Sequence, residues 1–148
     1  MRRLLNRLLA GCIILLLTAT LANAEMVSIN RKKVNMRSGP GTSYAILWEL
    51  GMGYPLKVVR TQKNWLKVQD FEGDEGWIYK PLISRSAHLI VKKKRINVRS
   101  GPGQNYKVIG KANYGVVFKT LKRNKGWVKI KHENGLTGWV SRSLVWGW

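Results

Sequence analysis

The sequence has little cysteine and histidine, the side chains of thiol chemistry and of many metal sites. Among its 148 residues there are one cysteine, Cys12, and two histidines, His88 and His132. Cys12 belongs to an N-terminal segment that, as argued below, we expect to be removed. The mature chain should then have no disulfide, no thiol nucleophile and no thiolate metal site. No group of His, Asp and Glu at ligand spacing is apparent either. The sequence therefore predicts neither a metal nor a cofactor.

Acidic residues are also scarce: there are seven Asp and Glu against 27 Lys and Arg, a formal net charge of +20. Residues 25–86 carry ten basic and six acidic side chains, a net of +4, whereas residues 87–148 carry fourteen and one, a net of +13. Such a field favours anionic partners and weakens with salt. The alternative is that the charge only keeps the protein soluble. The candidate polyanion contact is the densest basic run, Lys92, Lys93, Lys94 and Arg95.

The long apolar run of the sequence lies at the N-terminus. Three arginines within residues 2–7 are followed by the uncharged residues 8–22 and by the small-x-small site Ala22-Asn23-Ala24. This layout is typical of a secretory signal peptide, residues 1–24, cleaved between Ala24 and Glu25. The alternative is an uncleaved membrane anchor, although the run is somewhat short for a span of about 20 residues.

Lipid attachment at Cys12 is not expected, because the apolar residues 13–17 follow the cysteine whereas lipidation needs them before it. With or without cleavage, the residues after Ala24 are expected to be exported. Their location would be the periplasm, the cell envelope or the medium, and after cleavage they would not be transmembrane. An exported protein rarely meets nucleic acid, so no nucleic-acid partner is expected despite the basic charge.

An internal repeat is the most informative feature of the remaining sequence. At an offset of 62 residues, the segment Asn-x-Arg-Ser-Gly-Pro-Gly at 35–41 returns without a gap at 97–103. At the same offset Trp65 returns as Trp127, and the later Gly-Trp pair and a final leucine also recur. A fixed period means that one structural unit is made twice. This predicts two domains, residues 25–86 and 87–148, which leave no room among themselves for a separate catalytic domain.

Each unit is predicted to contain about five short strands joined by tight turns. Residues 127–131 alternate strictly, with Val128 and Ile130 on one face. Asn134-Gly135 and its counterpart Glu72-Gly73 predict two-residue hairpin turns, and a further hairpin is expected before each of Trp65 and Trp127. Imperfect alternation in residues 54–61 and 116–123 predicts a bulge. No sustained helical period follows residue 25, so the predicted fold is all-β, with two small barrels in tandem.

These motifs resemble the bacterial SH3-like domain family. Asn-x-Arg-Ser-Gly-Pro-Gly, then Trp-x-Lys-Val about 26 residues on (Trp-x-Lys-Ile in the second copy), then Gly-Trp and a final leucine occur in both repeats. The sequence is most similar to small secreted tandem-SH3 proteins of Gram-negative bacteria. The resemblance implies two SH3-like barrels outside the cytoplasm. It also implies a binding role, because family members use the barrel to hold cell-wall peptides or glycans, and those that hydrolyse peptidoglycan carry an additional catalytic domain.

We expect the protein not to be an enzyme. His88 aligns with Met26 across the repeat and His132 aligns with Asp70, so neither histidine belongs to a repeated site. A base, an orienting acid and a nucleophile would have to meet by accident of folding, and two histidines with seven acids offer little choice.

The Arg-Ser-Gly-Pro-Gly segment is interpreted as a structural turn. Proline fixes φ, and the flanking glycines permit a positive φ. A phosphate loop is not expected, because the third glycine of a dinucleotide fingerprint and a following helix are both missing. The predicted turn residues are Ser38, Gly39, Pro40 and Gly41, which return as Ser100, Gly101, Pro102 and Gly103.

The tryptophans are the candidate ligand contacts. Trp77 and Trp139 each precede an apolar residue and are predicted to be core. Trp65 and Trp127 share a strand face with lysines, so they either line a binding groove or form a structural lid. Two tyrosines just past the turn would form the other wall of such a groove. The candidate ligand-binding residues are Trp65, Trp127, Tyr44, Tyr106, Lys129 and Lys131.

Two features concern the arrangement of the units. The link after Leu82 has no Pro- or Gly-rich spacer, so the barrels are expected to lie close together. The final residues, Trp146-Gly147-Trp148, either pack back on a barrel or form an exposed aromatic tail.

Two functions are compatible with these observations. The leading hypothesis is a non-catalytic exported module that recognises peptidoglycan, by its glycan or its peptide, or another anionic polymer of the cell envelope. The alternative is a protein–protein adaptor that docks onto an envelope enzyme or assembly. The sequence does not name the ligand, because one fold can carry many functions.

Overall fold

The structure is a computed structural model that describes residues 24–148. The predicted signal peptide apart from Ala24, and the cysteine at position 12, lie outside the described residues. Ala24 and Glu25 are both exposed. Among residues 24–148, no helix is long and apolar enough to cross a membrane.

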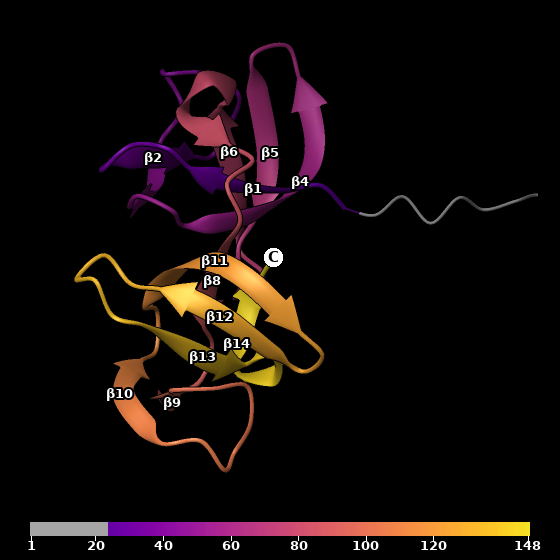
Figure 1. The fold of residues 1–148 in the computed structure, drawn as a ribbon. Coiled ribbons are helices and arrows are strands. Elements are labelled where there is room, and N and C mark those ends of the chain that lie inside the picture. The colour runs from indigo at the N-terminus through magenta and orange to yellow at the C-terminus, as the bar shows by residue number, and fades with distance from the viewer. Residues whose placement is uncertain (1–23) are drawn as a thin grey trace, which may run out of the picture.

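The first barrel is one antiparallel sheet in the spatial order β3-β2-β6-β5-β4-β1-β7 (Figure 1). Along the chain, a single turn of 3₁₀ helix (η1) precedes the last strand, β7. The elements are β1 (Met26–Ile29), β2 (Val34–Arg37), β3 (Ile46–Leu50), β4 (Pro55–Gln62), β5 (Trp65–Gln69), β6 (Glu75–Tyr79), η1 (Lys80–Leu82) and β7 (Ile83–Ser84).

The second barrel repeats this architecture element by element, in the order β10-β9-β13-β12-β11-β8-β14. Its elements are β8 (His88–Val91), β9 (Arg95–Arg99), β10 (Val108–Asn113), β11 (Val117–Asn124), β12 (Trp127–Lys131), β13 (Thr137–Ser141), η2 (Arg142–Leu144) and β14 (Val145–Gly147). The predicted all-β fold of two small barrels is confirmed. Each described barrel has seven strands rather than about five, because pieces as short as β7 are too brief to show alternation in the sequence.

Each barrel buries its own apolar core. In the second, Val98, Val128, Ile130 and Val140 are at most 1% exposed and surround Phe118. The first has the equivalent Met36, Leu66, Val68 and Ile78 around Leu56. These side chains occupy every second position of their strands, so the intervening residues of β2, β5, β9 and β12 face outward. The outward residues build the grooves described below.

The predicted bulge is present in both barrels. The register of β4 against β5 shifts between Val58 and Arg60, and that of β11 against β12 shifts between Thr120 and Lys122. One residue in each strand, Val59 or Leu121, is thereby left out of the pairing and is almost half exposed.

The predicted two-residue turn at Asn134-Gly135 is wrong, as is that at Glu72-Gly73. The amide of Gly135 donates to the carbonyl oxygen of His132 at 3.0 Å, and the amide of His132 donates to the carbonyl oxygen of Leu136 at 2.8 Å. These bonds enclose a three-residue loop, residues 133–135. Only the glycine has a positive φ, 94°, whereas a type I′ turn needs two such residues. The expected second hairpin is confirmed, with Lys63 and Lys125 at positive φ in its two copies.

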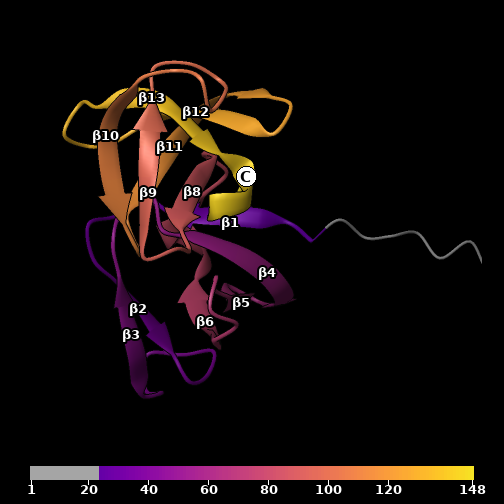
Figure 2. The ribbon, with the colours of Figure 1, turned by 90° about the horizontal axis from the view of Figure 1, so that it is seen from below.

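The two barrels lie against each other, as the short link predicts (Figures 1 and 2). The ring centroids of Phe71 and Tyr114 are 5.2 Å apart, and the Tyr114 hydroxyl donates a hydrogen bond to Glu72. The ring of His88, at the start of the second barrel, approaches Gly53 so closely that a Cβ there would lie 2.6 Å from it.

The C-terminal Trp-Gly-Trp segment packs back on a barrel. Trp146 lies within β14, which pairs with β8, and β14 also lies against β4 of the first barrel. The amide of Trp148 donates to the carbonyl oxygen of His88 at 3.1 Å, and the hydroxyl of Thr120 donates to that of Trp148 at 2.6 Å. Both tryptophan side chains are half-buried.

Candidate binding grooves

The same groove occurs at the same place in both barrels. It lies over the outward face of β2 in the first barrel and of β9 in the second, beside the tryptophan that begins β5 or β12. The Asn-x-Arg part of the repeated motif supplies this face: Asn97 and Arg99 point outward while Val98, between them, is buried.

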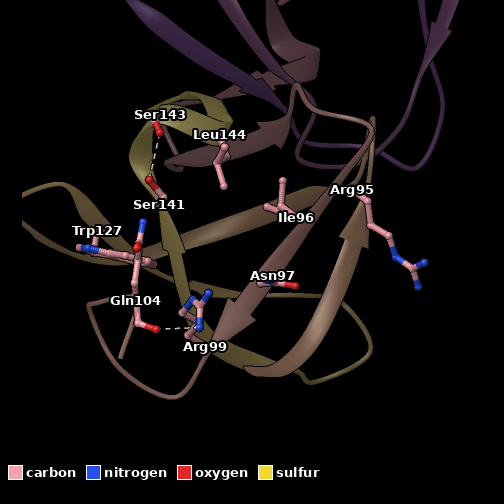
Figure 3. A pocket seen from close by; sticks show the side chains of 9 residues that line it. All are labelled: Arg95, Ile96, Asn97, Arg99, Gln104, Trp127, Ser141, Ser143 and Leu144. Atoms are coloured by element: carbon pink, nitrogen blue, oxygen red, sulfur yellow. Dashed lines mark hydrogen bonds between the residues drawn. The ribbon is translucent and has the colours of Figure 1, made fainter. Parts of the chain in front are cut away.

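The groove of the second barrel has a volume of about 270 Å³ (Figure 3). It combines one aromatic ring, two guanidinium groups, amide groups and hydroxyl groups. Arg95 and Trp127 lie at opposite ends of the lining in Figure 3, with Asn97 between them. The lining residues are Arg95, Ile96, Asn97, Arg99, Gln104, Trp127, Ser141, Ser143 and Leu144.

The groove of the first barrel is larger, about 540 Å³, and is lined by Lys33, Asn35, Arg37, Gly41, Thr42, Trp65, Tyr79 and Leu82. Seven of these align with lining residues of the second groove at the 62-residue offset. Six of the seven keep their general chemistry: a cation, an asparagine, an arginine, a polar residue, a tryptophan and a leucine. Trp65 and Trp127 are half-buried, and neither groove contains an acidic residue.

The motif arginine holds the loop that follows it. One terminal nitrogen of Arg99 donates to the carbonyl oxygens of Gln104 and Tyr106, both at 3.0 Å. The equivalent nitrogen of Arg37 donates to those of Thr42 and Tyr44, at 3.0 and 2.9 Å. A guanidinium has five N–H donors, so the remaining donors of each arginine stay available at the groove.

The motif glycines make room for a tyrosine. A Cβ on Gly39 would lie 2.2 Å from the Tyr44 ring, and one on Gly101 would lie 2.3 Å from the Tyr106 ring. These glycines could adopt a positive φ but do not, so the close approach of the tyrosine ring is what requires glycine here. The two tyrosines, 47% and 49% exposed, lie across their turns and do not line the grooves.

The two grooves differ at one wall. In the first, Tyr79 lies beside Trp65 with a centroid separation of 5.4 Å. Its counterpart in the second is Ser141, whose hydroxyl oxygen is 3.0 Å from that of Ser143. The first groove therefore has two aromatic rings, whereas the second has one ring and a pair of hydroxyl groups.

Trp77, predicted to be core, is buried, whereas Trp139 is not, and both lie on the outer face of their strands. Ile78 and Val140 face the core and are fully buried, so the preceding tryptophan of each strand points to the outer face. Trp77 is nevertheless 6% exposed, because it is covered from outside, and the guanidinium carbon of Arg60 lies 5.2 Å from its ring centroid. Trp139 is half-buried.

The predicted basic residues fall in three places. Arg95 lines the second groove, and the exposed Lys92, Lys93 and Lys94 form the loop leading into it. Lys129 is on the Trp127 face of β12 but does not line the groove, and Lys131 lines a different cleft, between the barrels.

Sequence reasoning missed Asn35 and Asn97, and it gave Arg37 and Arg99 no part in a groove. The signal was present in the sequence, because the asparagine and arginine alternate with buried residues and recur in both copies. The interpretation of the Arg-Ser-Gly-Pro-Gly part of the motif as a turn concealed it. Leu82 and Leu144 join the groove only because the 3₁₀ turn brings them beside the strands.

The described residues include one group of three carboxylates, Asp70, Glu72 and Asp74, whose oxygens lie within 4.8 Å of one another. One oxygen of Asp70 already accepts the amides of Glu72 and Asp74, both at 2.9 Å. This cluster therefore closes the β5–β6 loop by ordinary hydrogen bonds.

Taken together, the fold and grooves define a tandem of small all-β barrels with a repeated surface site. Residues 30–85 and residues 94–145 each match a family described as Bacterial SH3 domain. The chain belongs to the bacterial SH3 domain family and carries two such domains in tandem.

Over 139 residues the chain is 32% identical to a protein of Bacillus subtilis (strain 168) named "Putative N-acetylmuramoyl-L-alanine amidase YrvJ". The alignment covers 86% of this chain and 26% of that protein, so the chain spans about a quarter of the length of this relative.

Three solved structures are similar at low identity. NlpC1 of Trichomonas vaginalis (12% identity, TM-score 0.39) is matched over 86% of this chain and 47% of that one. An NlpC/P60 family protein of Bacillus cereus ATCC 10987 (13% identity, TM-score 0.38) is matched over 83% of this chain and 56% of that one. The structure titled "Endolysin LysPBC5 CBD" (17% identity, TM-score 0.35) is matched over 84% of this chain and 93% of that one.

Proposed function

We propose that this protein is a non-catalytic, exported module that binds peptidoglycan, or another anionic polymer of the cell envelope, in its two grooves. The observation that carries the proposal is the recurrence of one groove chemistry in both barrels: a half-buried tryptophan faces an outward row of cation, asparagine and arginine. Neither SH3 core needs these polar side chains, because they point away from it.

The groove chemistry suits a glycan that carries peptide carboxylates. The flat face of a tryptophan packs against the apolar face of a sugar ring. An arginine with free donors binds a carboxylate by charge-assisted, frequently bidentate hydrogen bonds. With no acidic residue in either lining, nothing in the groove repels such a ligand. The amide side chains can pair with acetamido or peptide groups.

The relative from Bacillus subtilis supports this ligand class. Its name assigns it an amidase activity on N-acetylmuramoyl-L-alanine, and the aligned part is 26% of its length. The remainder of that protein is long enough to contain the activity, so the aligned barrels serve as its binding part in this proposal. The lining of the two grooves here contains no histidine, carboxylate or cysteine.

The test is sedimentation of the purified protein with purified peptidoglycan. Trp127→Ala and Trp65→Ala should each reduce the pelleted fraction while the melting temperature changes little. Phe118→Ala is the comparison, because Phe118 is 1% exposed and its loss should destabilise the fold by about 3–5 kcal/mol. If the tryptophan variants pellet as the unaltered protein does, or unfold as readily as Phe118→Ala, the grooves are not the binding site.

An adaptor role is the second candidate, favoured by an apolar edge on the first barrel. Ile46, Leu47 and Trp48 of the edge strand β3 are 55%, 43% and 53% exposed. The counterparts of Ile46 and Leu47 are also apolar and exposed, but the counterpart of Trp48 is Gly110, so the exposed tryptophan is particular to the first barrel. An adaptor would pellet with peptidoglycan only when an envelope protein fraction is added, and Trp48→Ser would abolish that pelleting.

A further inference from the structure

The largest of the three cavities described above lies between the barrels and has a volume of about 860 Å³. Ligand sites typically have volumes of roughly 300–1,000 Å³ and occur preferentially at domain interfaces. The first barrel supplies loop residues, and the second supplies most of the wall. The lining consists of Lys32, Gly51, Met52, His88, Gly115, Val116, Val117, Lys119, Leu121, Lys131, His132 and Glu133.

Three of these residues form a row across adjacent strands. His88 of β8 lies directly opposite Lys119 of β11, and Lys119 lies directly opposite Lys131 of β12. Directly opposed side chains have Cβ atoms roughly 4.5–5.5 Å apart, and like charges in such positions destabilise a sheet. We call His88, Lys119 and Lys131 the basic row.

The fold does not require the basic row. The same three positions in the first barrel are Met26, Lys57 and Gln69, which pair in the same registers and carry a single positive charge. Another pair of opposed lysines in the second barrel, Lys122 and Lys129, does have a basic counterpart in the first. The basic row is therefore specific to the barrel face that borders the cleft.

One further residue of the cleft adds to the positive charge: Lys32 reaches it from the first barrel. None of the three lysines forms a salt bridge in the part of the chain that the structure describes. Burial lowers the pKa of His88, a hydrogen bond with the Ser86 carbonyl oxygen opposes this, and the charge of Lys119 lowers it further. Glu133 is the one acidic residue of the lining, against three lysines.

We propose that the cleft between the barrels binds a small polyanion, a compact molecule with two or more carboxylate or phosphate groups. Its charges would lie over the basic row and its remainder against Met52, Val117 and Leu121. Charge-assisted hydrogen bonds from both lysines would replace their mutual repulsion. Because Lys32 and the basic row come from different barrels, the bound anion would also hold the barrels together. This site is distinct from the two grooves.

The experiment is calorimetric titration of the purified protein with pyrophosphate and with citrate, at fixed ionic strength, with acetate as the monovalent comparison. Lys119→Gln/Lys131→Gln should weaken binding of the polyanion by about a hundredfold or more, since each lost charged hydrogen bond corresponds to a factor of about ten or more. Lys122→Gln/Lys125→Gln is the matched control: it removes the same charge from the same hairpin, outside the cleft lining.

A second readout does not depend on the ligand. Without any polyanion, Lys119→Gln/Lys131→Gln should melt at a higher temperature than the unaltered protein, because the repulsion in the basic row is relieved. With polyanion it should gain less further stability than the control variant.

The outcomes separate the possibilities. Binding of pyrophosphate alone identifies a phosphate ligand, and binding of citrate alone identifies a carboxylate ligand. Equal weakening in both double variants would show a diffuse response to net charge and overturn the site. Absence of binding by both anions would overturn it as well. Sedimentation with peptidoglycan through the tryptophan grooves is a separate measurement, so either proposal can fail alone.

Discussion

Arg99 and Tyr106 are joined by a hydrogen bond of 3.0 Å from the guanidinium to the tyrosine carbonyl oxygen, so the arginine that begins the Gly-Pro-Gly loop also holds its far end. Arg37 and Tyr44 repeat the relationship at 2.9 Å. The loop forms one side of each groove. This arginine therefore determines the shape of the groove as well as contributing to its positive charge.

Arg99→Gln should therefore loosen the loop as well as remove a charge. The variant loses two charge-assisted hydrogen bonds at an exposed site, and we expect the free energy of unfolding to fall by about 1–2 kcal/mol in urea denaturation. Arg95→Gln on the same strand is the control and should change stability by less than about 0.5 kcal/mol, as surface substitutions usually do. Equal losses in the two variants would contradict a holding role for Arg99.

Gly147→Ala should detach the C-terminal strand. Gly147 has φ 121°, and a Cβ there would lie 2.3 Å from the carbonyl oxygen of His88. We expect destabilisation by about 1–3 kcal/mol, with greater exposure of Trp148 to fluorescence quenchers. Gly115→Ala is the comparison, because its φ of 80° carries strain but nothing lies within 4 Å of the added Cβ. A Gly147→Ala protein no less stable than Gly115→Ala would show that the tail is not packed as described.

Stability should fall as the pH is lowered from 7.5 to 5.5. Burial lowers the pKa of His88 below its ordinary value of 6.5, so the folded state disfavours the proton that the unfolded chain accepts. The stabilisation is present above pH 6.5 and is lost progressively as the pH falls below it. His88→Phe, which keeps a ring beside Gly53, should remove this part of the decrease in melting temperature. If the decrease in melting temperature is unchanged in His88→Phe, the titrating group lies elsewhere.

Binding to anionic envelope polymers should depend on the loop Lys92, Lys93 and Lys94. These exposed residues lead directly into Arg95, and the amide of Lys92 donates to the carbonyl oxygen of Leu144, another groove residue, at 3.1 Å. Changing all three to Glu should abolish most of the pelleting with the polymer. Binding of the unaltered protein should also weaken as salt is raised beyond about 0.15 M, where the screening length drops below about 8 Å.

The control for that test is Lys122, Arg123 and Lys125 changed to Glu, which makes the same charge change at three residues that line neither groove. If both triple variants lose binding equally, the contact is with the overall charge of the second barrel. If neither loses it, recognition rests on the aromatic side chains or on a protein partner.

Several elements could be read directly from the sequence. The bulges after Val58 and Thr120 were predictable because an extra residue interrupts the alternation of apolar side chains. The turn at Asn134-Gly135 was predicted with the wrong length, because the same dipeptide suits a two-residue turn and the last positions of a three-residue loop. Trp139 was assigned to the wrong face because Trp139 and Val140 are both apolar. Only the placement of the strand against the core decides which of the two neighbouring side chains points inward.

The sequence by itself determined the repeat, the all-β class, the alternation of core residues and the uneven charge, since each is a property of residues close together in the chain. The tertiary structure alone decided where the sites are. Trp127 meets Asn97 and Arg99 only when β12 and β9 come together around β13, and Arg99 reaches the Tyr106 carbonyl only once the loop has closed. The basic row depends on the register of three strands, and a shift of one residue would turn Lys119 to the opposite face. Its approach to Lys32 depends further on how two barrels pack, which no local pattern in either repeat specifies.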